Sequence, residues 1–121
     1  MTPRRETGGS SSRASAAVTA RSCLRRRASR EAAAAVTRHA RDAQPWFLYL
    51  PFNAPHTPQQ ATAALLARFA HITDKTRQLY AAMVSGMDDA VGVVLEQLRK
   101  DGLDDNTFIV FLSDNGGPLE R

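Results

Sequence analysis

Oxygen-bearing side chains that suit a metal ion follow directly after an apolar run near the end of the chain. Residues 108–112 are Phe-Ile-Val-Phe-Leu, and the polar loop Ser-Asp-Asn-Gly-Gly occupies residues 113–117. The Asp114 carboxylate and the Asn115 carboxamide offer two hard oxygen ligands of the kind that divalent cations prefer. The two glycines let the backbone turn tightly around a bound ion or anion. The same residues are also ordinary turn chemistry, so a cation site and a plain turn are both open at this point.

A histidine held between prolines is the second candidate. Residues 53–58 are Asn-Ala-Pro-His-Thr-Pro, and they follow another apolar run over residues 46–52. The prolines restrict the backbone on both sides, so the His56 imidazole is held in one place instead of sweeping through solvent. The competing interpretation is a surface-loop histidine without a site.

The two apolar runs predict strands that are buried on both faces, because they are continuously apolar instead of alternating. Pro51 interrupts the first run only near its end. Between the runs, residues 61–69 are weakly helical, and residues 75–100 predict a long helix capped by Asp74. The expected fold class is therefore α/β, a mostly parallel sheet flanked by helices.

The order strand, helix, strand predicts where the candidate residues meet. Such a unit is parallel with a right-handed crossover, so both strands finish at the same edge of the sheet. Ligand sites in these folds lie beyond the carboxyl ends of the strands. His56 and the pair Asp114 and Asn115 are therefore expected at one rim, facing one cleft. Residues that only form turns have no reason to lie close together, whereas residues that bind one ion or anion must do so. The topology therefore favours a joint site.

The predicted long helix should pack deeply against the sheet. Its apolar residues recur every three or four positions: Leu79, Met83, Met87, Val91, Val94 and Leu98. The methionines are interpreted as core filler. Asp88 and Asp89 point about 100° apart on a helix, which argues against a shared metal site and for a solvated or capping role. Gly102 is expected to end the helix.

An earlier helix is predicted from an N-cap at Ser29 to about Asp42, with an alanine run supplying high helix propensity. His39 lies near its end, between Arg38 and Arg41. We interpret His39 as a solvent-facing residue that complements the helix dipole.

Length and composition indicate one soluble globular domain. The chain has 121 residues, of which 43% are hydrophobic and 23% charged. The sequence holds no apolar run of the roughly 18 residues needed to span a membrane. The single cysteine, Cys23, excludes an internal disulfide and a multi-cysteine metal site.

The basic charge belongs to the first residues of the chain. Residues 1–27 hold seven arginines and one acid, and the remaining residues are net acidic. With few large apolar residues, this basic tail is expected to be disordered. An RNA-binding or membrane-surface arm and a targeting peptide are the alternatives. The tail lacks aromatic residues for base stacking and the apolar core of a secretory signal, so a solvated N-terminus is favoured.

Three segments together resemble one protein family. They are WFLYLPFNAPHTP, LARFAHI and YAAMVSGMDDAVGVVLEQLRKDGLDDNTFIVFLSDNGGP. They resemble, in order and spacing over residues 28–118, the sulfatase catalytic domain of the alkaline-phosphatase superfamily, particularly the arylsulfatase type. The resemblance implies that Asp114 and Asn115 ligate a divalent cation, calcium or magnesium, and that His56 contacts the sulfate group. It also implies hydrolysis of sulfate esters by a formylglycine made within a C/S-x-P-x-R motif.

The chain departs from that family pattern at the nucleophile. Cys23 stands in Cys-Leu-Arg-Arg-Arg, which lacks the proline and lies too close to the first predicted strand. The family's N-terminal aspartate pair, the Lys and His around its nucleophile, and a basic residue after the Asp-Asn pair have no counterpart in these residues. We therefore expect residues 28–121 to be part of a sulfatase catalytic domain, with an incomplete metal site and no turnover alone.

Two other functions fit the same residues. One is a non-catalytic binding or interaction module with a basic tail, and the other is a phosphatase or phosphodiesterase of the same superfamily. The NAPHTP and SDNGG segments favour the sulfatase branch. A sulfate ester is the expected substrate of the complete domain, and neither specific nucleic-acid binding nor a membrane span is expected. Complete family members are often secreted, periplasmic or lysosomal.

Overall fold

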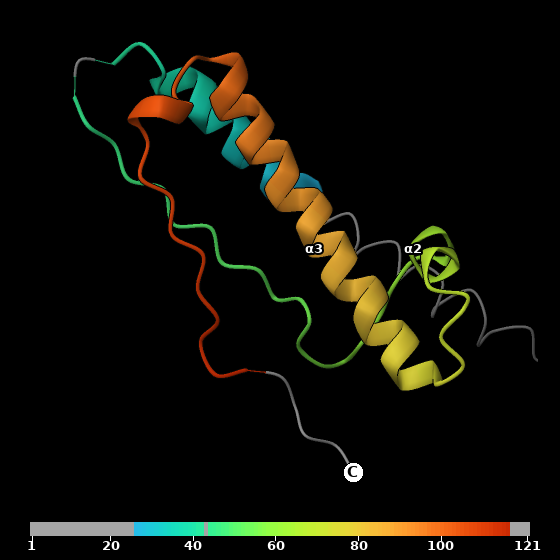
Figure 1. The fold of residues 1–121 in the computed structure, drawn as a ribbon. Coiled ribbons are helices and arrows are strands. Elements are labelled where there is room, and N and C mark those ends of the chain that lie inside the picture. The colour runs from blue at the N-terminus through green and yellow to red at the C-terminus, as the bar shows by residue number, and fades with distance from the viewer. Residues whose placement is uncertain (1–25, 43, 117–121) are drawn as a thin grey trace, which may run out of the picture.

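A layer of helices lies beside two extended segments (Figure 1). The computed structural model describes residues 26–42 and 44–116. These residues are helical over 26–39, in α2 (Ala63–Arg68) and in α3 (Lys75–Lys100), and a 3₁₀-helix, η1, spans Asp104–Asn106. No residue within the described ranges belongs to a β-strand.

Helix α3 forms where the sequence predicts it, and its N-terminus is capped as expected. The Asp74 carboxylate accepts a hydrogen bond of 2.8 Å from the backbone N–H of Arg77. This bond satisfies one of the backbone donors that a helix start leaves without a partner. One stripe of the helix is buried, and its residues are Ala82, Met83, Ala90, Val94 and Leu98.

A left-handed glycine ends α3. Gly102 has a φ of 68° and donates its N–H to the Arg99 carbonyl at 3.1 Å, while Leu103 donates to the Leu98 carbonyl at 2.9 Å. This pair of bonds is a Schellman motif, and Leu103 also packs against the apolar cluster that contains Leu98. The predicted helix end at Gly102 is confirmed.

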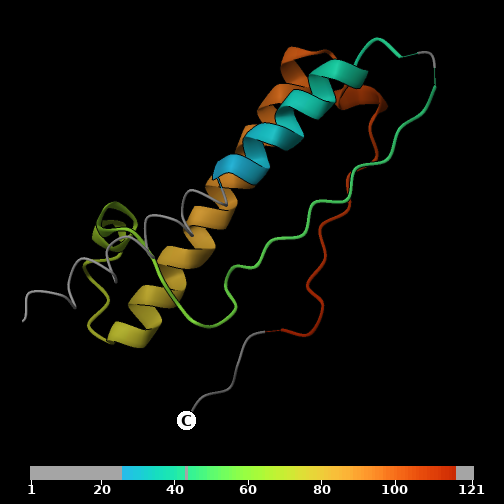
Figure 2. The same cartoon turned by 180° about the vertical axis from the view of Figure 1, so that it is seen from behind.

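The helix over residues 26–39 packs along the C-terminal half of α3, as both ribbon views show (Figures 1 and 2). Val36 is 1% exposed and shares one cluster with Ala32, Val94 and Leu98. Where this helix and α3 meet, Thr37 donates to an Asp101 carboxylate oxygen at 2.8 Å. Gln97 donates to the same oxygen at 3.0 Å. These two hydrogen bonds lower the pKa of Asp101 from its ordinary value.

The predicted N-cap at Ser29 is wrong, because the helix passes through this residue. Ser29 is 2% exposed, and its hydroxyl donates to the Arg26 carbonyl at 3.2 Å. A serine hydroxyl can bond backward to a carbonyl of the preceding turn as well as cap a helix start, and packing decides between the two. The predicted end of this helix agrees with the structure to within a few residues, and His39 is exposed there, with its imidazole against the Asp42 carboxylate.

Helix α2 closes the other end of the helical layer. Its cap is Thr62, whose hydroxyl accepts from the Leu65 N–H at 3.3 Å. Leu65 and Met83 share a buried cluster against which Met87 packs, so the interpretation of the methionines as core residues is confirmed. The Met83 sulfur also accepts a hydrogen bond of 3.3 Å from the Gln60 N–H.

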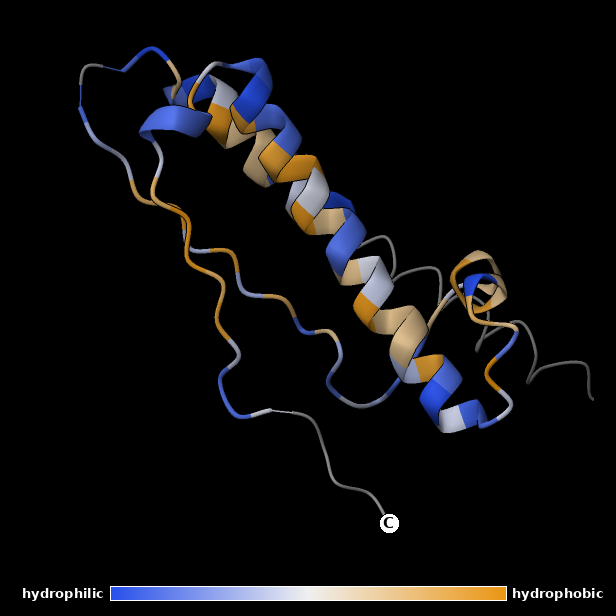
Figure 3. Cartoon of the chain, in the orientation of Figure 1, coloured by the Kyte–Doolittle hydropathy of each residue, from blue (hydrophilic) through white to orange (hydrophobic). Residues whose placement is uncertain are grey.

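The two apolar runs predicted as strands are extended but not buried on both faces. Over residues 46–52 exposure alternates: Trp46, Leu48 and Leu50 pack against the helical cluster, while Phe47 is 90% exposed. Residues 108–112 are all exposed, between 53% and 92%. The prediction of full burial is wrong here because the described residues place helices on one side only. Figure 3 shows how apolar both segments are.

The two segments run in the same direction, away from the C-terminal end of α3 (Figures 1 and 2). The predicted parallel sheet, which also needs backbone pairing, stays a prediction. Of the predicted basic tail, residues 1–25, including Cys23, lie outside the described residues, and Arg26 and Arg27 are helical. None of the helices in the described ranges is long and apolar enough to cross a membrane.

Candidate functional site

The His56 loop follows the first extended segment as a tight turn. The backbone N–H of His56 donates to the Asn53 carbonyl at 2.9 Å. The ring Nδ1 lies 2.7 Å from the Thr57 carbonyl oxygen. A carbonyl only accepts, so Nδ1 carries the proton in this contact and Nε2 is left to face a ligand. The side chain is exposed. The loop therefore orients the imidazole through its own backbone.

The Asp114 loop is also held by short-range hydrogen bonds. One Asp114 carboxylate oxygen accepts from the Asn115 N–H at 3.0 Å, and the Ser113 hydroxyl accepts from the Gly116 N–H at 3.2 Å. Gly116 has a φ of 76°, in the left-handed region that favours glycine. Asp114 therefore holds a turn and does not cap a helix. Both Asp114 and Asn115 are exposed, and a carboxylate with a carboxamide remains a donor pair suited to calcium or magnesium.

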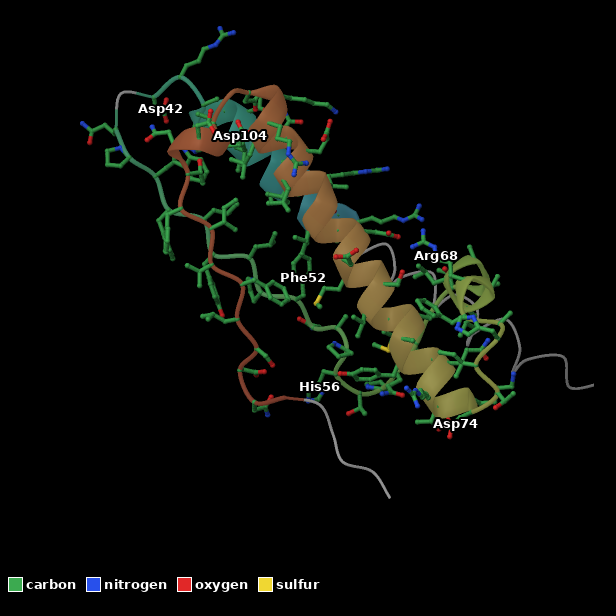
Figure 4. All side chains as sticks on the ribbon, in the orientation of Figure 1. Asp42, Phe52, His56, Arg68, Asp74 and Asp104 are labelled. Carbon is green, nitrogen blue, oxygen red and sulfur yellow. The ribbon has the colours of Figure 1, made fainter. Side chains whose placement is uncertain are left out.

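Both loops lie at the same end of the molecule. The extended segments that lead to them start near the C-terminal end of α3 and finish at the opposite end (Figures 1 and 2). Figure 4 places His56 at that end, far from Asp42 and Asp104. The described residues contain no group of three or more His, Cys, Asp or Glu side chains that could hold a metal ion. A calcium ion needs six to eight oxygen ligands, so the side chains of Asp114 and Asn115 could by themselves provide only a small part of such a shell.

A cavity lies on the opposite side of α3 from the extended segments, and His56, Asp114 and Asn115 do not line it. It has a volume of about 260 Å³ and lies between the start of the first helix, α2 and α3, lined by Arg26, Arg30, Arg68 and Asp89 among others. Arg68 forms an ion pair of 2.9 Å with Asp89 and donates to the Ser85 hydroxyl at 3.0 Å. The hydrogen bond between Arg68 and Asp89 is the main cause that raises the pKa of Arg68, and the charge of the Asp89 carboxylate raises it further.

The sequence analysis does not predict the ion pair between Arg68 and Asp89. It predicts a solvated or capping role for Asp89. The carboxylate is half exposed, so the solvated interpretation is partly right. The two residues are 21 positions apart on different helices, and no local pattern connects them.

Comparison with known proteins gives one consistent family. The family model described as Sulfatase matches residues 5–121. The uncharacterized sulfatase YdeN of Escherichia coli (strain K12) is 41% identical over 78 residues, which is 64% of this chain and 14% of that protein. Arylsulfatase J of Mus musculus is 38% identical over 74 residues, 61% of this chain and 12% of that protein.

A solved structure gives the same comparison in three dimensions. It is titled "Crystal structure of Ps i-CgsB in complex with k-i-k-neocarrahexaose", and it matches with a TM-score of 0.63 and 44% identity over 65% of this chain and 18% of that chain. The chain thus spans 12% to 18% of the length of these proteins. Because the family model covers nearly every residue, the chain belongs to the sulfatase family.

Proposed function

We propose that this chain is part of the catalytic domain of a sulfuric ester hydrolase and supplies one portion of its sulfate and metal site. In this proposal Asp114 and Asn115 are metal ligands and His56 contacts the sulfate group. Family membership supports the activity. One observation supports the roles of these residues. The two extended segments run in the same direction, so the His56 loop and the Asp114 loop that follow them lie at one end of the molecule (Figures 1 and 4).

The chemistry of these three side chains fits a sulfate ester. A bound calcium or magnesium ion would supply positive charge to the sulfate oxygens. Asp114 contributes a formal negative charge to the ion, and Asn115 contributes a neutral oxygen without adding charge. His56 has its Nδ1 proton engaged with the Thr57 carbonyl, so only Nε2 is free to meet a sulfate oxygen, as a donor when the ring is protonated. A proline-flanked turn keeps that nitrogen in a fixed position.

Weak metal affinity is part of the proposal. Two ligands out of six to eight leave most of the coordination shell to water, so calcium should bind with a Kd on the order of 1 mM or weaker. The chain should also lack turnover alone, because no Cys or Ser stands in a C/S-x-P-x-R segment of this sequence.

Calcium titration of the purified chain tests the metal role. We expect Asp114→Asn to abolish the calcium-dependent signal, measured by sensitised terbium luminescence with calcium competition. The matched control is Asp105→Asn, which removes another exposed carboxylate, from η1, and should leave binding unchanged. Equal loss in both variants would mean that the ion only follows net charge, and the assigned metal role would be wrong.

Assays with chromogenic esters test the reaction class. The chain should not hydrolyse an aryl sulfate, and added calcium should not change this. Turnover of an aryl sulfate that disappears in Cys23→Ala would show that Cys23 is the nucleophile after all. Turnover of an aryl phosphate instead would favour a phosphatase of the same superfamily.

A further inference from the structure

Three arginines line the cavity between the first helix, α2 and α3. Arg26 and Arg30 come from the first helix, and Arg68 comes from α2. We propose that this cavity is a binding site for a small dianionic oxyanion, namely a sulfate or phosphate group. The inference is independent of the proposed function, because the cavity shares no residue with the His56 and Asp114 loops.

The described residues that line the cavity carry an excess of positive charge. They include three arginines and one carboxylate, that of Asp89, so their formal charge is +2. Asp89 is already paired with Arg68, and Arg26 and Arg30 form no ion pair with any residue in the described ranges. Like charges that are held close together repel one another, and a bound anion relieves this repulsion. The excess charge therefore matches an anion with two negative charges.

The arginines reach the cavity from different helices. Arg26 and Arg30 are four positions apart and therefore lie on one face of the first helix. Arg68 lies on α2, on the side of α3 away from the extended segments (Figure 4). Its Nη1 donates to Asp89 and to Ser85, which holds the guanidinium beside the cavity. A guanidinium has five N–H donors, so the donors on its other nitrogens remain for a ligand.

The size and the apolar lining of the cavity suit a small ligand. Its volume of about 260 Å³ lies below the roughly 300–1,000 Å³ of sites for drug-sized ligands. Gly86 and Ala90 lie about one helical turn apart on α3, and their small side chains leave room at the floor of the cavity. Leu65 and Val93 add apolar walls, against which the carbon atoms of a small monoester would pack.

A tetrahedral oxyanion uses three arginines better than a carboxylate does. A carboxylate has two oxygens in one plane, and the fork of a single guanidinium can bind both of them. A sulfate or phosphate group presents oxygens in several directions, so arginines from two helices can each donate to a different oxygen. Arg26 and Arg30 are exposed, so an anion can reach them from solvent.

NMR titration of the full chain with sodium sulfate, sodium phosphate or sodium acetate, at constant ionic strength and about pH 8, tests the inference. We expect sulfate or phosphate to cause saturable shifts in the backbone amide signals of Thr62 and Ala90, which line the cavity, and acetate to cause none. The anion that saturates at the lower concentration identifies the ligand group.

Two arginine variants test whether the cavity is responsible. Arg30→Gln should weaken binding of this anion at least about tenfold, because it removes charge-assisted hydrogen bonds. Arg38→Gln is the matched control, since Arg38 is an exposed arginine of the same helix that does not line the cavity. It removes the same charge and should leave binding unchanged.

The titration of the unaltered chain decides the question whether or not a variant folds. Absence of saturable shifts with both sulfate and phosphate would overturn the inference, and so would shifts of equal size with acetate. Equal weakening in the two arginine variants would show that the anion only follows net charge. Shifts confined to the His56 loop would place the anion at the other site and would also overturn the inference.

Discussion

The helical layer and the extended segments contain similar apolar residues but differ sharply in burial. Leu98 in α3 is 4% exposed, whereas Phe108 is 92% exposed. A helix satisfies its backbone hydrogen bonds internally and needs cover on only one stripe. A central strand needs neighbours for its backbone and cover on both faces. One half of this molecule is therefore stabilised by its own packing, whereas the apolar side chains of the other half lack cover within the described residues.

The largest expected contrast is between truncations in the two halves. Leu98→Ala should lower the free energy of unfolding by about 3 kcal/mol, because it leaves a cavity between α3 and the first helix. Phe108→Ala should change it by less than about 0.5 kcal/mol, because an exposed side chain loses little contact. Urea unfolding at high dilution measures both. A large cost for Phe108→Ala at high dilution would contradict this contrast between the two halves.

The next contrast compares two glycines of the helical half. Gly102→Ala should destabilise the chain by about 1 kcal/mol, because alanine is strained at a φ of 68°. Gly92→Ala should instead stabilise it by about 0.5–1 kcal/mol, since Gly92 lies inside α3 and an added Cβ meets nothing within 4 Å. Thermal unfolding of the two variants should therefore show shifts of opposite sign. Shifts of the same sign would contradict the helix end assigned at Gly102.

The smallest effect concerns the contact between the first helix and the end of α3. Hydrogen bonds from Gln97 and Thr37 lower the pKa of Asp101 below its ordinary 3.8. A carboxyl with a lowered folded pKa stabilises the fold at pH values above its unfolded pKa, and this contribution is lost as the pH falls through the folded pKa. As the pH is lowered below about 4, the melting temperature should decrease less in Asp101→Asn than in the unaltered chain. Asp105→Asn is the matched control, and it should keep the full acid dependence.

Local patterns in the sequence predict the helical half well. The cap at Asp74, the bounds of α3 and the glycine at 102 all follow from side chains within one turn of the feature they determine. Ser29 shows where this reasoning fails: the same hydroxyl can cap a helix start or bond backward inside a helix, and burial against neighbours decides.

Burial of the extended half could not be predicted in this way, because it depends on residues far apart in the chain. Continuous apolarity predicts that a segment will be buried somewhere, without specifying by what, and residues 108–112 are exposed in this chain. The pair of Arg68 and Asp89 was missed for a related reason, since the two residues meet only once α2 packs on α3. The sequence identifies His56, Asp114 and Asn115 as candidate site residues from their chemistry and their positions after the apolar runs. Their joint role stays a proposal.

The proposal that His56 and Asp114 belong to one site is tested most directly by paramagnetic broadening. Manganese would replace calcium or magnesium in the purified chain, and the ring signals of His39, His56 and His71 would be followed by NMR during the titration. We expect the His56 signals to broaden first, because the His56 loop lies at the same end of the molecule as the Asp114 loop. Asp114→Asn should remove this preference, and Asp105→Asn should retain it. Equal broadening of all three histidines, or broadening of His56 that persists in Asp114→Asn, would contradict the joint site.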